Sequence, residues 1–231
     1  MRNHDNTTPL KVEAQHLGFF ETPLAYTRLK DAEPLLEDLE AAIFKNMAIS
    51  AGLNRSNIGG WHSDTDMLNW GGSAAVKLAD TTIKICKRLS HFQDSTVDSY
   101  DWSVRMWANV TSNGGLNQAH AHPGNVWAAV LYLDLGDDLG KDLSEAPGSI
   151  KDVGGAFYIE DPRFPMAAMH NTAARLIGSN GQPQQYEVEL NLERGNLLVF
   201  PAWLKHGVRQ YTGSRQRVSV AMNIDAVKKS K

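Results

Sequence analysis

The spacing of apolar residues changes once along this chain of 231 residues, from a helical to a strand period, and this change constrains the fold more than any other feature. Before residue 100, apolar side chains recur at the 3.6-residue period in two segments, which predicts helices at 32–49 and 74–92. Asp31 precedes the first helix as a candidate N-cap and Ser73 precedes the second. The predicted buried face of the second helix consists of Val76, Ala79, Ile83, Cys86 and Leu89.

From Val104 onward the pattern has a period of two. Residues 104–110 alternate as a strand does, whereas 126–133 form a near-continuous apolar run, which is typical of a central strand buried on both faces. Further strands bounded by turn residues are expected at 155–160, 185–191, 196–200, 206–211 and 216–224. Short strands that follow two helices predict a mainly β fold, a sandwich or barrel core with the helices packed outside it.

The length predicts one domain over residues 1–231, with a helical part at about 1–100 and a β core at about 101–226. Two connections, 134–154 and 161–184, are long enough to be lids or binding loops. A plain surface insertion is an equal alternative for the first of them.

Composition excludes several classes of function. The 23 Lys and Arg against 26 Asp and Glu give a net charge of −3, which argues against a nucleic-acid partner and a polybasic membrane anchor. The N-terminal residues lack the apolar stretch of a secretory signal and no apolar run is long enough to span a membrane, so a cytoplasmic protein is expected. The single cysteine, Cys86, excludes a disulfide framework and a Cys-ligated cluster, so a metal would need nitrogen and oxygen ligands.

Three of the eight histidines fit a metal site. His120 and His122 are two residues apart, and on a strand such residues point to the same face. His206 follows a glycine turn, an apolar strand and Pro201, and it begins the next predicted strand. In a jelly roll, strands distant in sequence lie side by side, so His206 can face the other two. Three ligands on one face leave open positions on the metal, as a non-haem Fe(II) oxygenase requires.

A pair of residues on the next predicted strand fits a carboxylate clamp. Arg217 and Ser219 are again two residues apart, eleven and thirteen residues beyond His206. A guanidinium fork with a hydroxyl can hold a carboxylate in bidentate fashion. One strand from a metal, this clamp suits the distal carboxylate of 2-oxoglutarate.

The order His-x-His, Gly-x5-Pro-x4-His, Arg-x-Ser resembles that of the Fe(II)/2-oxoglutarate-dependent oxygenases, whose core is a double-stranded β-helix, a cupin-like jelly roll. More narrowly, the chain resembles a group of bacterial and phage 2-oxoglutarate–Fe(II) oxygenases from about residue 18 to 225. The motifs that carry this resemblance are Gly59-Gly60-Trp61-His62-Ser63, Trp107-Ala108-Asn109, His120-Ala121-His122-Pro123, Leu131-Tyr132-Leu133, Asp161-Pro162-Arg163, Phe200-Pro201 and Arg217-Val218-Ser219. The resemblance implies a dioxygenase that converts 2-oxoglutarate to succinate and CO₂ while O₂ oxidises a substrate.

The chain departs from this family pattern at His122, where an Asp or Glu is usual. His122 can be the third ligand, or it can lie behind the ligands while water takes the third position. A carboxylate from Glu160 or Asp161 is a further alternative. The stretch Trp127-Ala128-Ala129 is also bulkier than the Ser-Gly usual in the narrower group, which predicts a narrowed pocket.

Other residues are weaker candidates. Asn109 is a candidate for a hydrogen bond to 2-oxoglutarate, and Trp127 and Arg163 are candidates for the substrate side. The sequence His62-Ser63-Asp64 imitates the His-x-Asp motif, but it lies in a glycine-rich stretch read here as a loop. It therefore suits loop packing or a pocket wall better than a metal. The remaining histidines, His4, His16, His91 and His170, have no organised neighbours.

Two other functions fit parts of the pattern: a metal-binding cupin that does not use 2-oxoglutarate, and a non-catalytic jelly-roll binding module. The glutamate of the cupin motif is absent after His122, where Val126 and Trp127 stand instead. The sequence does not distinguish a small-molecule substrate from a peptide. The helical layer offers a surface for a homodimer, because two-fold dimers are the commonest oligomers.

Overall fold

A computed structural model of the chain describes residues 13, 15, 17, 20–137, 153–163, 171 and 173–230. Most of the first long connection and part of the second lie outside these residues, as do His4, His16 and His170.

The helices precede most of the sheet in the sequence. They are α1 (Glu33–Met47), α2 (Met67–Trp70), α3 (Gly72–Leu89) and a 3₁₀ turn, η1 (Val97–Ser99). The helices α1 and α3 correspond to the two predicted helices. Within the described residues, no helix combines the length and apolar character that crossing a bilayer requires.

The strands form one antiparallel sheet that folds over on itself. They are β1 (Ala25–Arg28), β2 (Asn57–His62), β3 (Tyr100–His120), β4 (Trp127–Leu135), β5 (Phe157–Glu160), β6 (Glu187–Leu190), β7 (Asn196–Pro201), β8 (His206–Val208) and β9 (Arg217–Lys228). Their order in the sheet is β1-β7-β4-β9-β3-β8-β5-β6, and β2 also pairs with β3. This mainly β arrangement confirms the predicted double-stranded β-helix.

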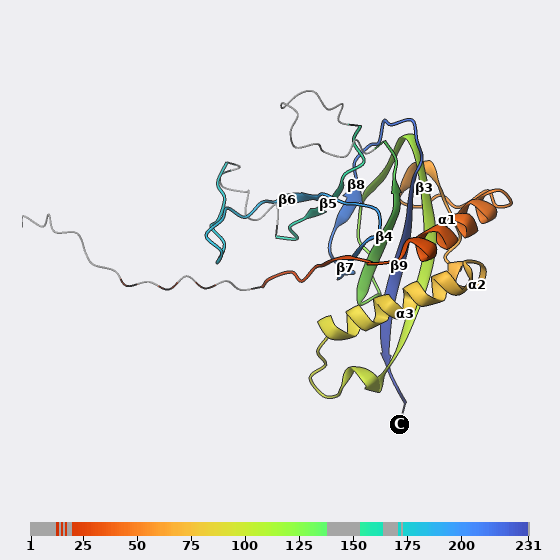
Figure 1. Cartoon of the computed structure of the whole chain (residues 1–231). Coiled ribbons are helices and arrows are strands. Elements are labelled where there is room, and N and C mark those ends of the chain that lie inside the picture. Colours follow the sequence, from red (N-terminus) through yellow and green to blue (C-terminus); the bar gives the residue numbers. More distant parts are fainter. Residues whose placement is uncertain are drawn as a thin grey trace, which may run out of the picture.

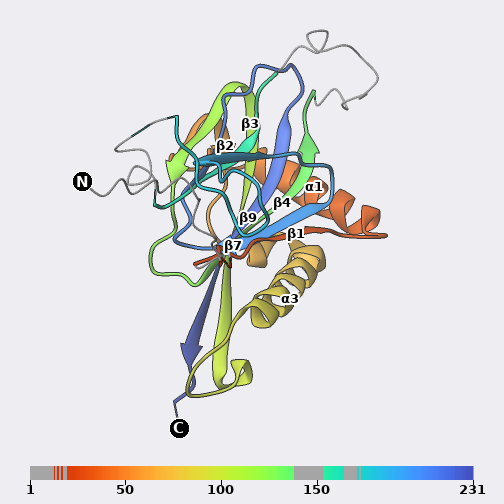
Figure 2. The same cartoon turned by 90° about the vertical axis from the view of Figure 1, so that its left-hand side faces the viewer.

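The long strand β3 joins the two layers. Its first half, from Tyr100 to Thr111, pairs with β9, and its end, from Asn117 to His120, pairs with β8. One layer therefore contains β7, β4, β9 and the first half of β3, and the other contains the end of β3 with β8, β5 and β6. Helices α1 and α3 cover the first layer on the side away from the second (Figures 1 and 2).

Alternation along β9 separates the helix-facing core from the interior between the layers. Val218, Val220 and Met222 belong to the buried cluster that contains the helical residues Leu39 and Leu78. Because side chains on a strand point alternately to its two faces, the odd-numbered residues from Arg217 to Asn223 face the interior. This alternation aims the polar residues of β9 at one site.

Three local predictions were wrong. Asp31 does not cap α1; Ala32 holds the N-cap position without a side-chain cap, and Asp31 adopts a positive φ of 51°. Ser73 lies inside α3, which begins at Gly72 and ends at Leu89. The glycine-rich stretch read as a loop contains β2, because its backbone bonds to β3.

The buried face of α3 also differs from the predicted one. Val76 is 49% exposed, whereas Leu78 is 1% exposed and Cys86 is fully buried. Burial raises the pKa of the Cys86 thiol to about 12, which fits the predicted role as a small core residue.

We expect Leu78→Ala to lower the free energy of unfolding by about 2–5 kcal/mol, because it leaves a cavity in the core. The matched control on the same helix, Val76→Ala, should change it by less than about 0.5 kcal/mol. Urea denaturation of both variants checks this prediction. Equal losses in the two variants would contradict the observed helix face.

Candidate metal and cofactor site

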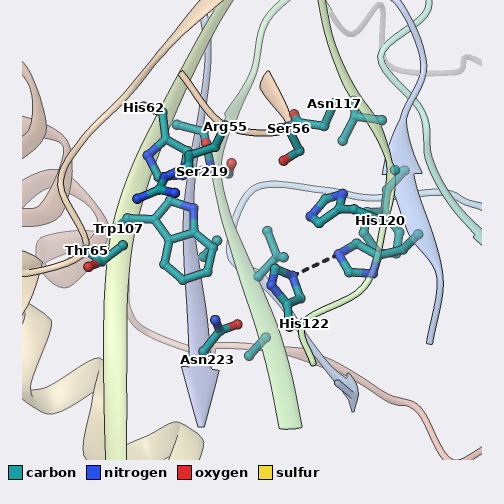
Figure 3. Close-up of a pocket in the computed structure, with 18 of the residues that line it drawn as sticks. Arg55, Ser56, His62, Thr65, Trp107, Asn117, His120, His122, Ser219 and Asn223 are labelled. Atoms are coloured by element: carbon teal, nitrogen blue, oxygen red, sulfur yellow. Dashed lines mark hydrogen bonds between the residues drawn. The ribbon is translucent and has the colours of Figure 1, made fainter. Parts of the chain in front are cut away.

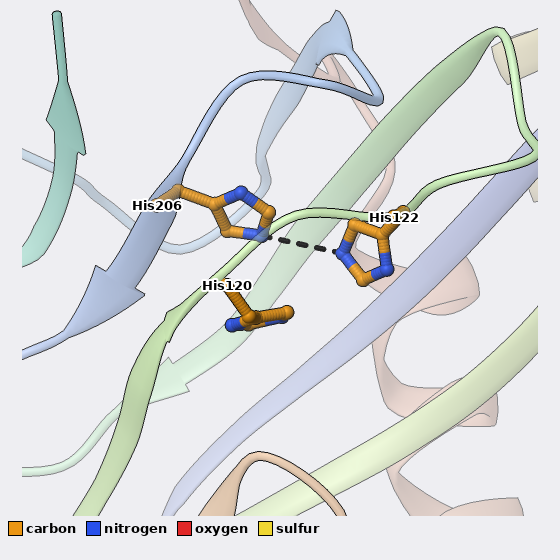
Figure 4. Close-up of side chains that lie close together, drawn as sticks. All are labelled: His120, His122 and His206. Carbon is orange, nitrogen blue, oxygen red and sulfur yellow. Dashed lines mark hydrogen bonds between the residues drawn. The ribbon is translucent and has the colours of Figure 1, made fainter. Parts of the chain in front are cut away.

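Three imidazoles converge where β3 ends and β8 begins (Figure 4). His120 is the last residue of β3 and lies directly opposite His206, the first residue of β8. His122 follows just after the strand, where its backbone N–H donates to the carbonyl of Ala202 at 2.8 Å. One ligand nitrogen from each ring lies within 4.8 Å of those of the other two. The predicted trio is therefore together, although His122 is not itself on the strand.

Backbone carbonyls orient two of the rings. The Nδ1 atoms of His120 and His206 lie 2.7 Å from the carbonyl of Gln118 and 2.8 Å from that of Leu204. Since a carbonyl only accepts, each Nδ1 carries the proton and each Nε2 keeps a lone pair free. This is the second contact that metal-binding histidines usually make.

The spacing of the ring nitrogens suits a metal ion. The Nε2 atoms of His122 and His206 are 3.3 Å apart. With metal–nitrogen bonds of about 2.1 Å, two ligands at right angles lie about 3 Å apart. In its Nε2–H form the neutral His122 ring donates to the lone pair of His206; with its proton on Nδ1 instead, both Nε2 lone pairs face the same point, and in that form the donor set fits a metal.

Burial keeps the three rings neutral. It lowers the pKa of His122 from 6.5 to about 4 and that of His206 to about 3, and it also lowers the pKa of His120. Neighbouring rings add to the shift for His122 and His206. Neutral imidazole is the form that ligates metals.

The carboxylates that were alternatives for the third ligand are engaged elsewhere. Glu160 pairs with Lys205 at 2.8 Å, and Asp161 pairs with Arg163 at 2.8 Å. Within the part of the chain that the structure describes, the three histidines form the one cluster suited to a metal. His122 thus completes the cluster at the position where the family pattern has an Asp or Glu.

The three rings line one end of a pocket of about 390 Å³ between the two layers (Figure 3). This size is typical of small-molecule sites. The other polar and aromatic residues on its walls are Arg55, Ser56, His62, Thr65, Trp107, Asn109, Asn117, Tyr132, Phe157, Ser219 and Asn223.

Ser219 and Asn109 lie opposite each other on β9 and β3, and both line the pocket as predicted. The amide oxygen of Asn109 is buried without a hydrogen-bond partner among the described residues, and so is that of Asn223. A buried acceptor without a donor costs free energy, so both oxygens suit a ligand that donates hydrogen bonds.

Arg217 lies two residues before Ser219 on β9, and its side chain lies next to the pocket rather than on its wall. The side chain is buried, its Nη1 donates to the carbonyl of Leu135 at 3.3 Å, and its guanidinium carbon lies 5.3 Å from the centre of the Tyr211 ring. Its charge acts on the pocket residue Tyr132, opposing the rise that burial causes in the pKa of that phenol.

Glycine at position 155 makes room for this guanidinium. Gly155 has a φ of +81°, and a Cβ there would collide with Nη1 of Arg217. Both the backbone conformation and the space therefore require glycine.

The two substrate-side predictions were wrong in position. Trp127 faces the helices, where its Nε1 donates to Ser90 Oγ at 2.9 Å, so it does not narrow the pocket. Arg163 is an exposed residue paired with Asp161, on a separate hollow that Tyr186 also lines. Neither side chain lines the pocket that contains the histidines.

His62 is a pocket wall, which is one of the two roles predicted for it. It is buried at the end of β2 and stacks on Trp107 with 5.6 Å between ring centres. Trp107 and Asn223 also line the pocket and were not among the predicted site residues. Trp107 also lies 5.8 Å from the His122 ring. The signal that identifies Trp107 and Asn223 is strand parity, because they lie two residues from Asn109 and four from Ser219 on the same strands.

We expect the affinity for a divalent ion such as Ni(II) to fall less between about pH 8 and about 5.5 than that of a site of three ordinary histidines, because the lowered pKa values leave fewer protons to displace. Ordinary histidines with a pKa of 6.5 would lose affinity over this range. Calorimetric titrations at several pH values check this, with a short His-Ala-His peptide as the control. A tenfold loss between pH 7 and 6 would contradict it.

Comparison with known proteins identifies a family that matches this chain. A model of the family described as "Putative 2OG-Fe(II) oxygenase" matches residues 105–223, just over half of the chain. No curated protein matches the sequence.

Solved structures share the fold at low identity. A prolyl-4-hydroxylase from Pseudomonas putida is 14% identical, with 88% of this chain and 92% of that chain covered and a TM-score of 0.52. A prolyl hydroxylase from Trichoplax adhaerens, in complex with a hypoxia inducible factor peptide fragment, is 10% identical, with 87% and 83% covered and a TM-score of 0.57. HygX from Streptomyces hygroscopicus, with nickel and 2-oxoglutarate bound, is 11% identical, with 88% and 83% covered and a TM-score of 0.56.

The family match includes all three histidines, the Arg-x-Ser pair and Asn109, and it agrees with the resemblance that the motifs indicate. The chain belongs to the family of Fe(II)- and 2-oxoglutarate-dependent oxygenases.

Proposed function

We propose that His120, His122 and His206 hold the iron of this dioxygenase, and that Arg217, Ser219 and Asn109 hold 2-oxoglutarate beside it. The observation that carries the proposal is the convergence of three neutral imidazoles whose ligand atoms lie within 4.8 Å of one another. When bound, iron and 2-oxoglutarate supply the oxidising chemistry, in which O₂ is consumed and succinate and CO₂ are released.

The histidines position the metal at the pocket wall. Carbonyl hydrogen bonds on Nδ1 of His120 and His206 fix the direction of each Nε2. Three neutral ligands leave the full positive charge of the ion, which favours a dianionic co-substrate such as 2-oxoglutarate.

Arg217 supplies the opposite end of the co-substrate site. Burial strengthens a charge-assisted hydrogen bond from its guanidinium to a carboxylate. Ser219 lies on the pocket wall two residues from Arg217 on β9, and Tyr132, its partner in the neighbouring strand β4, lines the same pocket. Asn109, across from Ser219, offers its amide N–H groups to the same ligand, because 2-oxoglutarate has only acceptors.

Apolar walls keep water from the reacting atoms. Phe157 lies 5.6 Å from the His206 ring and Trp107 lies 5.8 Å from the His122 ring, measured between ring centres. A low dielectric at these positions strengthens the polar contacts that remain.

The substrate shares this pocket and is a small molecule or a peptide. Structures of the same fold support both possibilities, since one was solved with hygromycin B and another with a peptide fragment. A homodimer through the helical layer stays a prediction.

We expect the wild-type protein with Fe(II) to release succinate from 2-oxoglutarate, and His206→Ala and His122→Ala each to reduce that release at least 100-fold by losing the metal. His122→Asp should retain the metal, because it restores the two-histidine, one-carboxylate set of many non-haem iron oxygenases. His91→Ala, on an exposed histidine, is the control. Absence of 2-oxoglutarate binding in the wild type would refute the proposed function, and full metal affinity in His122→Ala would remove His122 from the ligands.

We expect Arg217→Gln to raise the Kd for 2-oxoglutarate at least tenfold, because a charge-assisted contact contributes about 1.5–3 kcal/mol. Gly155→Ala should weaken binding as well, by displacing the guanidinium. Calorimetry on the Ni(II)-loaded protein measures both, and Arg163→Gln is the matched control outside the pocket. Unchanged affinity in Arg217→Gln would refute the clamp.

A further inference from the structure

Among its described wall residues, the pocket has one positively charged side chain and no negatively charged one. Among the described residues that line it there is no Asp or Glu, whereas Arg55 lies at its edge. The proposed metal would add two further positive charges with three neutral ligands. An anionic co-substrate accounts for the metal and for Arg217, which leaves Arg55 without a role.

Arg55 is placed by the chain just before β2. Its backbone N–H donates to the side-chain oxygen of Asn57 at 2.8 Å, which fixes the entry into the strand. The side chain is exposed to solvent at the edge of the pocket (Figure 3). The residues that the structure describes offer its guanidinium no ion pair within 4 Å.

Arg55 and Arg217 act on different walls. The charge of Arg55 contributes to the lowered pKa of His62, after the larger effect of burial, whereas the charge of Arg217 acts on Tyr132. In the sheet, Arg55 precedes β2 on one side of β3, and Arg217 begins β9 on the other side. Two separate anionic groups can therefore be held.

Two uncharged polar side chains on the backbone next to Arg55 also line the pocket. Ser56 follows it in the chain and accepts a backbone hydrogen bond from Gln118, which brings it beside Asn117 on β3. Both side chains line the pocket (Figure 3). Their hydroxyl and amide groups make no hydrogen bond to another described residue. A guanidinium, a hydroxyl and an amide together are suited to bind an oxyanion.

We propose that Arg55, with Ser56 and Asn117, binds an oxyanion of the primary substrate, so that the substrate is an organic acid or a phosphate ester. This inference rests on the proposed function, because it assigns the remaining pocket wall to the molecule that is oxidised. The carboxylate and the phosphate share the same chemistry at this site, and the test distinguishes them.

The test uses the full chain loaded with Ni(II) and saturated with 2-oxoglutarate. Three probes of similar shape are titrated by calorimetry: phenylacetate, phenyl phosphate and the neutral phenylacetamide. We expect at least one anion to bind the wild type about tenfold or more tightly than the amide, and the tighter anion identifies the group. Arg55→Gln should abolish this preference and Arg55→Lys should retain part of it, since lysine keeps the charge but not the fork. Arg163→Gln is the control.

Two results would overturn the proposal: no anion preference in the wild type, or the same preference in Arg55→Gln. A tenfold loss of 2-oxoglutarate affinity in Arg55→Gln, measured before any probe is added, would also overturn it, because Arg55 would then hold the co-substrate. Failure of the proposed function has a different signature, namely no 2-oxoglutarate binding by the wild type. The anion preference is then measured without 2-oxoglutarate and still decides the role of Arg55.

Discussion

The antiparallel pairing of β3 with β8 is the constraint on which the metal site depends. It sets His120 directly opposite His206, although 85 positions separate them in the sequence. A shift of one residue in this register would turn one imidazole to the other face of its strand. The strand β8 is only three residues long, and β5 holds its second edge through the pairing of Ile159 with His206. The folded-over sheet is thus needed to hold one short strand in register.

The sequence predicts those parts of the fold that have a strong local pattern. The apolar period places α1 within two residues of its observed ends, and the apolar run at 126–133 predicts β4. The strand β2 could not be predicted in this way, because Asn57, Gly59 and Gly60 are turn-forming residues and only hydrogen bonds to β3 make the segment a strand. The prediction of Asp31 as an N-cap failed for a similar reason. Its backbone has a positive φ, as in a turn, and the neighbouring residue types do not indicate this conformation.

The same difference separates the predicted site residues from the missed ones. The histidines, Arg217 and Ser219 stand in a recognisable order along the chain. Their types and spacing were therefore sufficient to predict that they come together at one site. Trp127 lies in a run that is apolar on both faces. Such a run has no alternation of polar and apolar residues, so the sequence does not show which face of the strand carries the Trp127 side chain. The wall residues Trp107 and Asn223 required knowledge of which strand face is interior. Arg55 required the position of β2, which composition concealed.

The hydrogen bonds that orient His120 and His206 come from the backbone carbonyls of Gln118 and Leu204 rather than from side chains. Side chains at these two positions can therefore vary, within what the strand and the core tolerate, without removing the orienting group. In many metal sites a carboxylate side chain performs this task and must be retained together with the ligand. Here the path of the main chain sets the direction of two ligands. This part of the site therefore tolerates mutations that change the rest of the pocket.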